Sequence, residues 1–261
     1  MIARAPGADT CPGFPRYFNI GGHWVNSYKF FLCVGIYAGT LVSAAVAERS
    51  GISPLRMGLA CLGCAISGLI GARIYHLLVS APHYLRERSW AAVWDSTRGG
   101  WSVFGALPAL ALVSLLLASA LQIPAAVFWD HMILGIVFGG IWVRLGCVFN
   151  GCCGGKETRG WYGVCLHDTR GLRKRRIPVQ FMEIGWWILA GAGLIWLWPR
   201  SFAPGTYALG VLCWYGLGRF WLEPLREAPD LVSGRVRIDQ VAAGLLAIAA
   251  GYGLLLLVPW R

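Results

Sequence analysis

The sequence predicts an all-α, polytopic membrane protein with seven transmembrane helices. Of its 261 residues, 57% are hydrophobic and only 13% are charged, and the mean hydropathy is +0.57. An ordinary globular domain has roughly 25% charged residues, so lipid must bury much of the apolar surface here. The apolar residues gather in charge-free runs that are long enough to cross a bilayer. This composition excludes a disordered chain, a secreted disulfide scaffold and a soluble nucleic-acid-binding protein.

The charge-free runs place the seven helices along the chain. We expect them at about residues 29–47, 57–79, 102–121, 125–143, 180–198, 206–222 and 239–258. Only residues 122–124 separate the third from the fourth, which predicts a tight hairpin. The 35 glycines favour close packing between helices. We expect residues 1–261 to form a single integral membrane domain, with a short polar N-terminal segment, 1–27, and a basic glycine-rich loop, 144–178.

The net charge of +11, from 23 basic and 12 acidic residues, is unusual for so apolar a chain. Anionic lipid headgroups are the natural partners, because guanidinium groups bind phosphate bidentately. Nucleic acid is not expected, because there is no soluble basic domain to hold it. The basic run Arg170–Arg176, just before the fifth helix, either anchors the chain on headgroups or recruits an anionic lipid substrate. Most bases lie on the side of the N-terminus, which the positive-inside rule alone would place in the cytoplasm.

Several ionisable residues lie within or at the ends of the predicted helices. Such groups are costly in a bilayer and mark either function or internal pairing. They are Arg73, Asp130, His131, Glu183, Arg219, Glu223 and Asp239. Arg219 and Glu223 are four residues apart on one helical face, which favours an ion pair at the membrane rim. Arg73 either reaches the headgroups or belongs to a site.

The segment from Arg144 to Lys156 combines glycines with basic and amide side chains. Its four glycines let the backbone bend and come close to a ligand, and Asn150 lies among them. This composition is typical of an anion site. A glycine-rich stretch alone is weak evidence, and a plain re-entrant turn is the alternative.

The same segment resembles the signature of the prolipoprotein diacylglyceryl transferase family, and the resemblance extends over nearly the whole chain. The signature positions are matched by Arg144, Gly146, Asn150, Gly151 and Gly155. A second family stretch is matched by Tyr215, Gly216, Arg219, Glu223 and Arg226, followed after one extra residue by Pro229 and Asp230. Three further motifs are matched by Pro178 with Gln180 and Glu183, by Tyr28, and by Arg73.

The resemblance implies an enzyme of the bacterial plasma (inner) membrane. The family moves a diacylglyceryl group from phosphatidylglycerol, an anionic phospholipid, to the cysteine thiol of a prolipoprotein and releases glycerol phosphate. No cofactor is implied. The resemblance also implies an exterior N-terminus and a cytoplasmic C-terminus, against the charge rule.

The resemblance assigns roles to individual residues. Arg144 and Arg219 would hold the phosphate and stabilise its growing charge, and Glu223 would orient them or accept the thiol proton. The residues implied to bind substrate are Tyr28, Arg73, Asn150, Gly151, Gly155, Gln180, Glu183 and Arg226.

Three positions depart from the family pattern. Phe104 stands where the family has a histidine, Cys147 replaces an asparagine, and Cys152 replaces a glutamate, with Cys153 beside it. Phenylalanine cannot transfer a proton. The phosphate-holding half of the site is therefore kept, and the half that activates the acceptor is altered. The alternatives are a related transferase with a non-lipoprotein acceptor and a non-catalytic phospholipid-binding protein.

Cys147, Cys152, Cys153 and Cys165 form a sequence cluster with His167. The spacing is not one that zinc sites use, so we predict no metal ion. A disulfide is favoured if this segment faces an oxidising compartment. Alternatively, Cys152 or Cys153 acts as a nucleophile beside an arginine, or exchanges disulfides with a quinone-linked partner.

Overall fold

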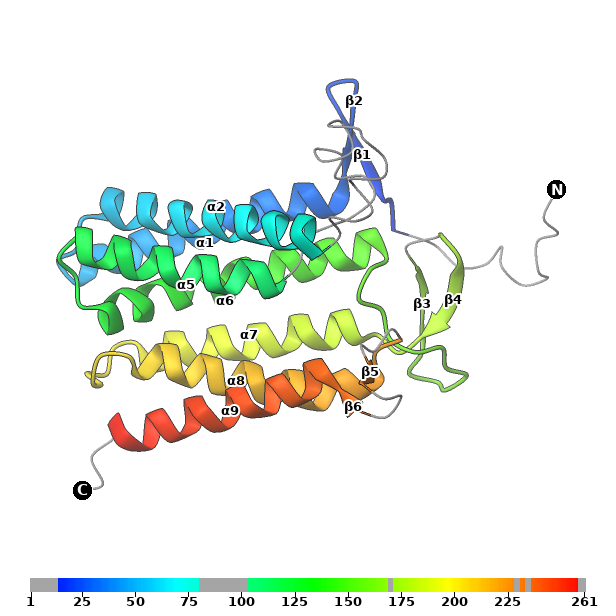
Figure 1. Cartoon of the computed structure of the whole chain (residues 1–261). Coiled ribbons are helices and arrows are strands. Elements are labelled where there is room, and N and C mark those ends of the chain that lie inside the picture. Colours follow the sequence, from blue (N-terminus) through cyan, green and yellow to red (C-terminus); the bar gives the residue numbers. More distant parts are fainter. Residues whose placement is uncertain (1–13, 80–102, 169–170, 228–230, 233–235, 258–261) are drawn as a thin grey trace. The chain divides into compact units, whose positions relative to one another are not determined.

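The computed structural model describes residues 14–79, 103–168, 171–227, 231–232 and 236–257 (Figure 1). Within these residues the chain forms seven α-helices. They are α1 (Ser27–Arg49), α2 (Pro54–Val79), α5 (Val103–Ala120), α6 (Ala125–Asn150), α7 (Val179–Leu197), α8 (Thr206–Leu222) and α9 (Ile238–Leu257). Each helix lies on one of the charge-free runs, and six of them begin and end close to the predicted bounds.

The prediction was wrong at the end of the fourth helix. Helix α6 continues to Asn150, so Arg144 and Cys147 lie in its last two turns rather than in a loop. Arginine is a good helix former, and the guanidinium group of Arg144 is paired with a carboxylate. The helix ends where Gly151 adopts a φ of 75° and donates its N–H to the carbonyl of Cys147 at 2.9 Å.

Short antiparallel hairpins occupy the connections between helices. Strands β1 (Tyr17–Ile20) and β2 (His23–Asn26) precede α1, and β3 (Val164–His167) pairs with β4 (Arg173–Arg176) before α7. After α8 come the 3-10 turn η2 (Glu223–Leu225) and the pair β5 (Leu231–Val232) and β6 (Val236–Arg237). The sequence did not predict these strands, because polar segments of this length give no periodic signal.

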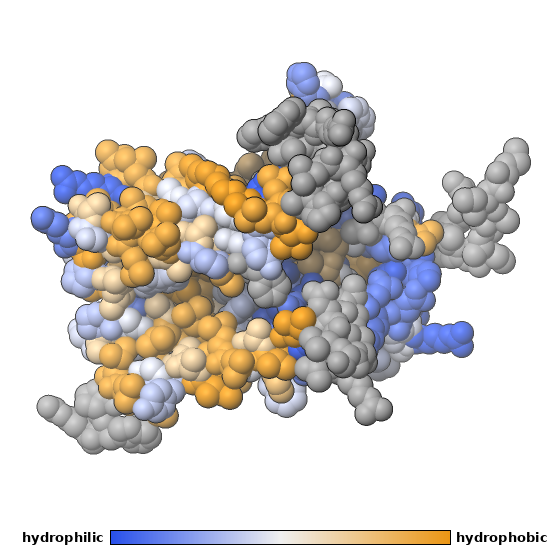
Figure 2. All heavy atoms as spheres, viewed as in Figure 1, coloured by the Kyte–Doolittle hydropathy of each residue, from blue (hydrophilic) through white to orange (hydrophobic). Residues whose placement is uncertain are grey.

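The helices carry the surface of a membrane protein. Five of the described helices, α1, α2, α6, α7 and α9, are long and apolar enough to cross a membrane, while the apolar part of α5 is shorter. On α9, Leu245, Ile248 and Leu256 are 63%, 71% and 70% exposed. Figure 2 shows that hydrophobic side chains dominate the visible surface of the helices, whereas hydrophilic ones gather over β3 and β4. Lipid, not water, is the solvent that such a surface requires. The chain is an all-α membrane protein.

The structure divides into two compact units, one of residues 43–132 and one of the described residues before and after them. In the second of these, α1 and α6 cross through glycines: a methyl group on Gly39 would lie 2.5 Å from the carbonyl oxygen of Gly135. Glycine is required for so close an approach between helices. In the unit of residues 43–132, Gly71 of α2 and Gly105 of α5 allow the same kind of contact. The expectation of a single integral membrane domain stays a prediction.

Candidate functional site

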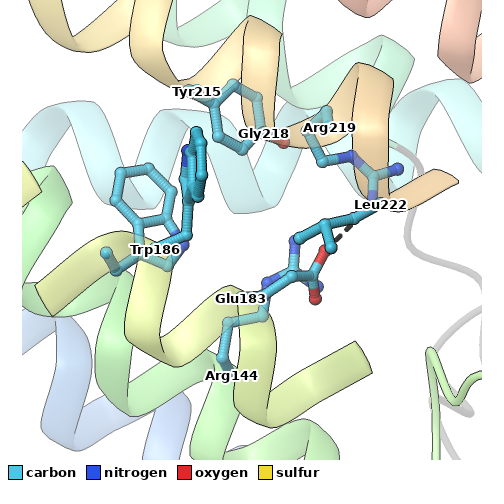
Figure 3. Close-up of a pocket in the computed structure, with 8 residues that line it drawn as sticks. Arg144, Glu183, Trp186, Tyr215, Gly218, Arg219 and Leu222 are labelled. Carbon is cyan, nitrogen blue, oxygen red and sulfur yellow. Dashed lines mark hydrogen bonds and ion pairs between the residues drawn. The ribbon is translucent and has the colours of Figure 1, made fainter. Parts of the chain in front are cut away.

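A buried carboxylate on α7 joins two arginines from neighbouring helices. Arg144 of α6 places Nη1 3.2 Å from Oε2 of Glu183, and Arg219 of α8 places Nη1 3.0 Å from Oε1 of the same carboxylate. Glu183 is only 4% exposed. Figure 3 shows the two arginines approaching Glu183 from different sides. Arg219 and Arg144 lie 36 and 39 residues from Glu183 in the sequence, and both contact its carboxylate.

Further ion pairs extend this arrangement. Arg219 Nη2 lies 2.8 Å from Oε2 of Glu223 and 3.3 Å from Oδ2 of Asp239, and Arg226 Nη1 lies 3.5 Å from Oε2 of Glu223. The predicted pair of Arg219 with Glu223 is confirmed. We call the set Arg144, Glu183, Arg219, Glu223, Arg226 and Asp239 the arginine–carboxylate network. Its three cations and three anions balance, as buried charges require.

Aromatic side chains wall one side of the network. The rings of Trp187 and Tyr215 stack with centroids 5.3 Å apart, and those of Trp186 and Trp214 stack at 4.2 Å. A methyl group on Gly218 would lie 2.2 Å from Nε1 of Trp186, so only glycine fits there. Trp186, Trp187, Tyr215 and Gly218 line a pocket with Arg144, Glu183, Arg219 and Leu222, and its volume of ≈ 10 Å³ is about enough for one water molecule. The pocket thus leaves little room for water beside Glu183, which lowers the local dielectric there.

The loop after α6 is fixed to the segment after α8 by its backbone. Gly155 forms a bridge with Arg226, and a methyl group on Gly155 would lie 2.3 Å from the carbonyl oxygen of Ile177. At Gly151 a methyl group would lie 2.7 Å from the carbonyl oxygens of His167 and Asp168. Both glycines therefore permit close backbone packing, and their predicted contact with substrate stays a prediction.

Neutral side chains surround the same loop. Gln180 donates to the carbonyl of Cys152 at 3.0 Å, and Asn26 donates to Oδ1 of Asn150 at 3.2 Å. Tyr28 lies beside α6, where a methyl group on Gly146 would be 3.4 Å from its Cα atom. Three of the predicted substrate-binding residues are thus gathered near the loop. Arg73 lies on α2, in the other unit, and its predicted role stays a prediction.

The sequence cluster of cysteines is divided by the fold. The Sγ atoms of Cys147, Cys152 and Cys153 all lie within 4.8 Å of one another, and these three residues are free thiols. Cys165 instead is disulfide-bonded. The His167 ring lies with Nε2 3.1 Å from the carbonyl oxygen of Phe149. We call Cys147, Cys152 and Cys153 the three-cysteine cluster.

Within this cluster, the surroundings shift the pKa values of Cys152 and Cys153 in opposite directions. Hydrogen bonds from the thiols of Cys147 and Cys152, together with Arg226 and Arg144 nearby, hold the pKa of Cys153 far below its usual range, although burial opposes this. For Cys152, a hydrogen bond from Cys147 lowers the pKa, but its own bond to Cys153 and burial outweigh this and raise the pKa to about 11. Of these two thiols, Cys153 therefore has the lower pKa.

A cleft of ≈ 200 Å³ opens beside the cluster. It is lined by Gly151, Cys152, Cys153, Gly154, Asp168, Arg226 and Glu227. Burial alone would lower the pKa of Arg226, but Cys153, Glu183 and Glu223 raise it, so this arginine is a permanent cation at the wall. Arg226 thereby connects the cleft with the arginine–carboxylate network.

The basic run before α7 has two parts. Arg173, Lys174 and Arg175 of β4 are exposed, whereas Arg176 is 2% exposed and pairs with Glu227 and, at 3.6 Å, with Asp168. The sequence analysis missed this inner role of Arg176, because no local pattern reveals an acid 51 residues away. It also did not single out Trp186. Some positions named there lie outside the described part of the chain: Arg170, Pro229, Asp230 and the side chain of Phe104.

Comparison with known proteins gives a consistent result. The family model for prolipoprotein diacylglyceryl transferase matches residues 15–257. A phosphatidylglycerol–prolipoprotein diacylglyceryl transferase of a Nostoc species is 28% identical over 260 residues, covering 93% of this chain and 88% of the relative. The protein of that name from Gloeobacter violaceus is 26% identical over 253 residues (93% and 92% covered), and that from Synechococcus elongatus is 27% identical over 263 residues (94% and 89%).

Proposed function

The chain belongs to the prolipoprotein diacylglyceryl transferase family, and from this premise we propose how its residues carry out the transfer. It is a membrane transferase that moves a diacylglyceryl group from phosphatidylglycerol to a prolipoprotein. Its donor is thus an anionic phospholipid. The acceptor group in this proposal is a cysteine thiol of the prolipoprotein.

Arg144 and Arg226 hold the phosphodiester of the lipid. Both guanidinium groups act electrostatically on Cys153, and Arg226 lines the cleft of ≈ 200 Å³. The two acids of the cleft wall, Asp168 and Glu227, are both paired with Arg176, which draws their carboxylates toward that guanidinium group. The glycerol phosphate headgroup occupies the cleft, and the diacylglyceryl tails lie in the surrounding lipid.

Arg219, Glu183 and Glu223 position the phosphate-binding arginines. Arg219 is within 3.3 Å of three carboxylates, so it has less charge to offer a phosphate than Arg144 or Arg226, each paired with one carboxylate among the described residues. Glu183 orients Arg144, and Glu223 orients Arg226. Gln180, Asn150 and Tyr28 add neutral hydrogen-bonding groups around the loop.

The transfer is a substitution at the glyceryl carbon that carries the phosphate. The acceptor thiolate forms a carbon–sulfur bond there, the carbon–oxygen bond breaks, and glycerol phosphate leaves with the electron pair. The leaving phosphate gains negative charge as this bond breaks. Arg144 and Arg226 stabilise that charge through charge-assisted hydrogen bonds to the phosphate oxygens.

The observation that carries the proposal is the position of Arg226 in the wall of the thiol-lined cleft, with Arg144 acting electrostatically on Cys153 of the same wall. The test uses the full-length protein in vesicles of phosphatidylglycerol with a peptide that carries a prolipoprotein-type cysteine. We expect the peptide to gain the mass of a diacylglyceryl group and glycerol phosphate to appear in equal amount. Vesicles of phosphatidylcholine are the control and should give neither product. An unmodified peptide in phosphatidylglycerol would contradict the proposal.

A second candidate keeps the donor and changes the acceptor. It is favoured by Cys147 and Cys152, which stand at two signature positions where the family has other residues. In this case glycerol phosphate is released from phosphatidylglycerol when a small thiol is added, and it is not released when the peptide is added. If the protein binds phosphatidylglycerol but neither the small thiol nor the peptide causes release of glycerol phosphate, it is a non-catalytic lipid-binding protein.

We also propose that all seven helices cross the bacterial inner membrane, with the N-terminus outside and the C-terminus in the cytoplasm. The disulfide at Cys165 supports an oxidising environment for β3 and β4. The basic residues on the side of the N-terminus then bind the anionic substrate and do not determine the topology. Enzyme reporters fused after residue 261 test this: a cytoplasmic reporter should be active there and a periplasmic one inactive.

A further inference from the structure

The three-cysteine cluster has no part in the phosphate chemistry proposed above, yet its geometry is that of a metal site. Its Sγ atoms lie within 4.8 Å of one another. Three thiolates bound to one zinc ion at about 2.3 Å would be about 3.8–4.0 Å apart, so small side-chain movements suffice to close around an ion. The sequence spacing predicted no metal, but the fold brings these sulfurs together whatever their spacing.

The backbone is arranged to make the thiols converge. Side chains of adjacent residues point apart in a helix or a strand, so Cys152 and Cys153 would ordinarily diverge. Cys153 has a φ of 59°, in the left-handed region, which costs a non-glycine residue about 1 kcal/mol. Among the described residues other than glycine, only Gln122 also has a positive φ. Strain of this kind is characteristic of functional sites, and here it turns two neighbouring thiols toward Cys147.

Charge and access also fit a bound cation. Cys147 is 2% exposed, while Cys152 and Cys153 border the cleft of ≈ 200 Å³. A divalent ion with three thiolates carries one net negative charge, and the guanidinium groups of Arg144 and Arg226 act electrostatically on Cys153, one of the three thiols. The cleft leaves the fourth position of a tetrahedral site accessible, as in catalytic zinc sites with three protein ligands.

We propose that Cys147, Cys152 and Cys153 hold a Zn²⁺ ion whose fourth position, open to the cleft, binds the acceptor cysteine as a thiolate. This inference rests on the proposed function. On binding, the acceptor thiol releases its proton to water, and the resulting thiolate attacks the glyceryl carbon as described above, with no change of oxidation state. The ion thereby supplies the thiol activation that Cys152, in place of a glutamate, cannot supply as a general base.

Two other roles for the cluster are less consistent with its chemistry. A diacylglyceryl group carried on Cys152 or Cys153 would form a thioether, which a second thiol does not readily displace. A disulfide within the cluster is the other alternative, because Cys165 points to an oxidising compartment in which unprotected thiols pair. Metal binding protects the thiols from that oxidation.

The test begins with metal binding in the full-length protein, without lipid or peptide. The purified chain is reduced, treated with a chelator and titrated with Co²⁺ as a spectroscopic substitute for Zn²⁺. We expect one ion per chain, with an intense thiolate-to-cobalt charge-transfer band and tetrahedral d–d bands. The variants C147S, C152S and C153S should lose the ion, whereas C213S, which changes a free cysteine of α8, should keep it. Equal thermal unfolding midpoints of the metal-free proteins exclude misfolding as the cause.

The second arm adds the acceptor peptide to the cobalt protein. The charge-transfer intensity should rise by about one third as three thiolates become four, and a peptide with serine in place of cysteine should leave it unchanged. A wild-type protein without the thiolate band, a band that survives C152S, or no response to the thiol peptide would each overturn the inference. So would a two-hydrogen mass loss from a disulfide in the cluster of the isolated protein.

The two proposals fail in distinguishable ways. If peptide transfer proceeds undiminished in the metal-free protein, the proposed function stands and the metal inference is wrong. If the cobalt spectra behave as expected but phosphatidylglycerol releases no glycerol phosphate, the metal site stands and the proposed function is wrong.

Discussion

The arginine–carboxylate network and the three-cysteine cluster lie beside each other but are built in different ways. The network takes its six charged groups from α6, α7, α8, η2, α9 and the residue after η2, and each charge depends on a partner from another element. The cluster comes from the last turn of α6 and the loop that follows. The network matches the family motifs at nearly every position, whereas the cluster departs from them at two.

The difference indicates which part of the site can change without disturbing the other. Loss of Glu183, Glu223 or Arg219 would leave Arg144, Arg226 or Asp239, respectively, without its partner in the network, which is strongly destabilising. A short loop has no such constraint, because its side chains can change while its backbone keeps its contacts. The donor half of the site is thus fixed by electrostatics, and the acceptor half is free to adopt new chemistry.

The largest effect should come from the network. Arg144→Gln removes a cation from the leaving phosphate, and we expect transfer to fall by about 10³-fold. Arg56→Gln, a change at an exposed arginine of α2, is the control and should leave the rate unaltered. The measurement is the initial rate of glycerol phosphate release. A loss below tenfold would mean that Arg144 does not contact the phosphate.

Changing the cluster should separate acceptor activation from donor binding. We expect the double variant C152A/C153A to transfer about 10²-fold more slowly while it still binds phosphatidylglycerol through Arg144 and Arg226. The reason is that the thiols act on the acceptor and not on the phosphate. Lipid binding is measured by co-purified phospholipid and transfer by peptide mass. Full activity in this variant would remove the cluster from the mechanism.

Glu183→Gln should affect stability more than chemistry. It leaves Arg144 without its carboxylate and weakens one of the three pairs of Arg219, so we expect the free energy of unfolding to fall by about 3 kcal/mol. Transfer should fall about tenfold, because a positioning group is lost and the cations remain. Thermal unfolding in detergent and the transfer rate are measured together. An unchanged unfolding midpoint would show that the network does not stabilise the fold.

The smallest effect should come from the glycine that ends α6. Gly151→Ala places a methyl group 2.7 Å from backbone atoms at a φ of 75°, and we expect a destabilisation of about 1–2 kcal/mol. Gly185→Ala in α7 is the matched control, because nothing lies within 4 Å of its added methyl group. That change should stabilise the helix by about 0.5–1 kcal/mol. Equal unfolding midpoints for the two variants would contradict the packing argument.

The sequence by itself determined the helices and most of the network. Charge-free runs mark the helices because a bilayer accepts only apolar residues over that length, and i, i+4 spacing marks the pair of Arg219 with Glu223 because a helix repeats every 3.6 residues. The motif matches added Arg144, Glu183 and Arg226 to the same site. Charge-free runs, i, i+4 spacing and motif matches all depend only on the order of residues in the sequence, so they can be identified without a structure.

Only the tertiary structure decided the contacts between distant residues. It paired Asp239 with Arg219 and buried Arg176 against Asp168 and Glu227. It also carried α6 past Arg144 to Asn150 and paired Arg144 with a carboxylate on another helix. The spacing of the cysteines argued against a metal, whereas a left-handed residue at Cys153 brings the three sulfurs together. Convergence of this kind depends on backbone direction and on partners far away in the chain, and neither is encoded in a local pattern.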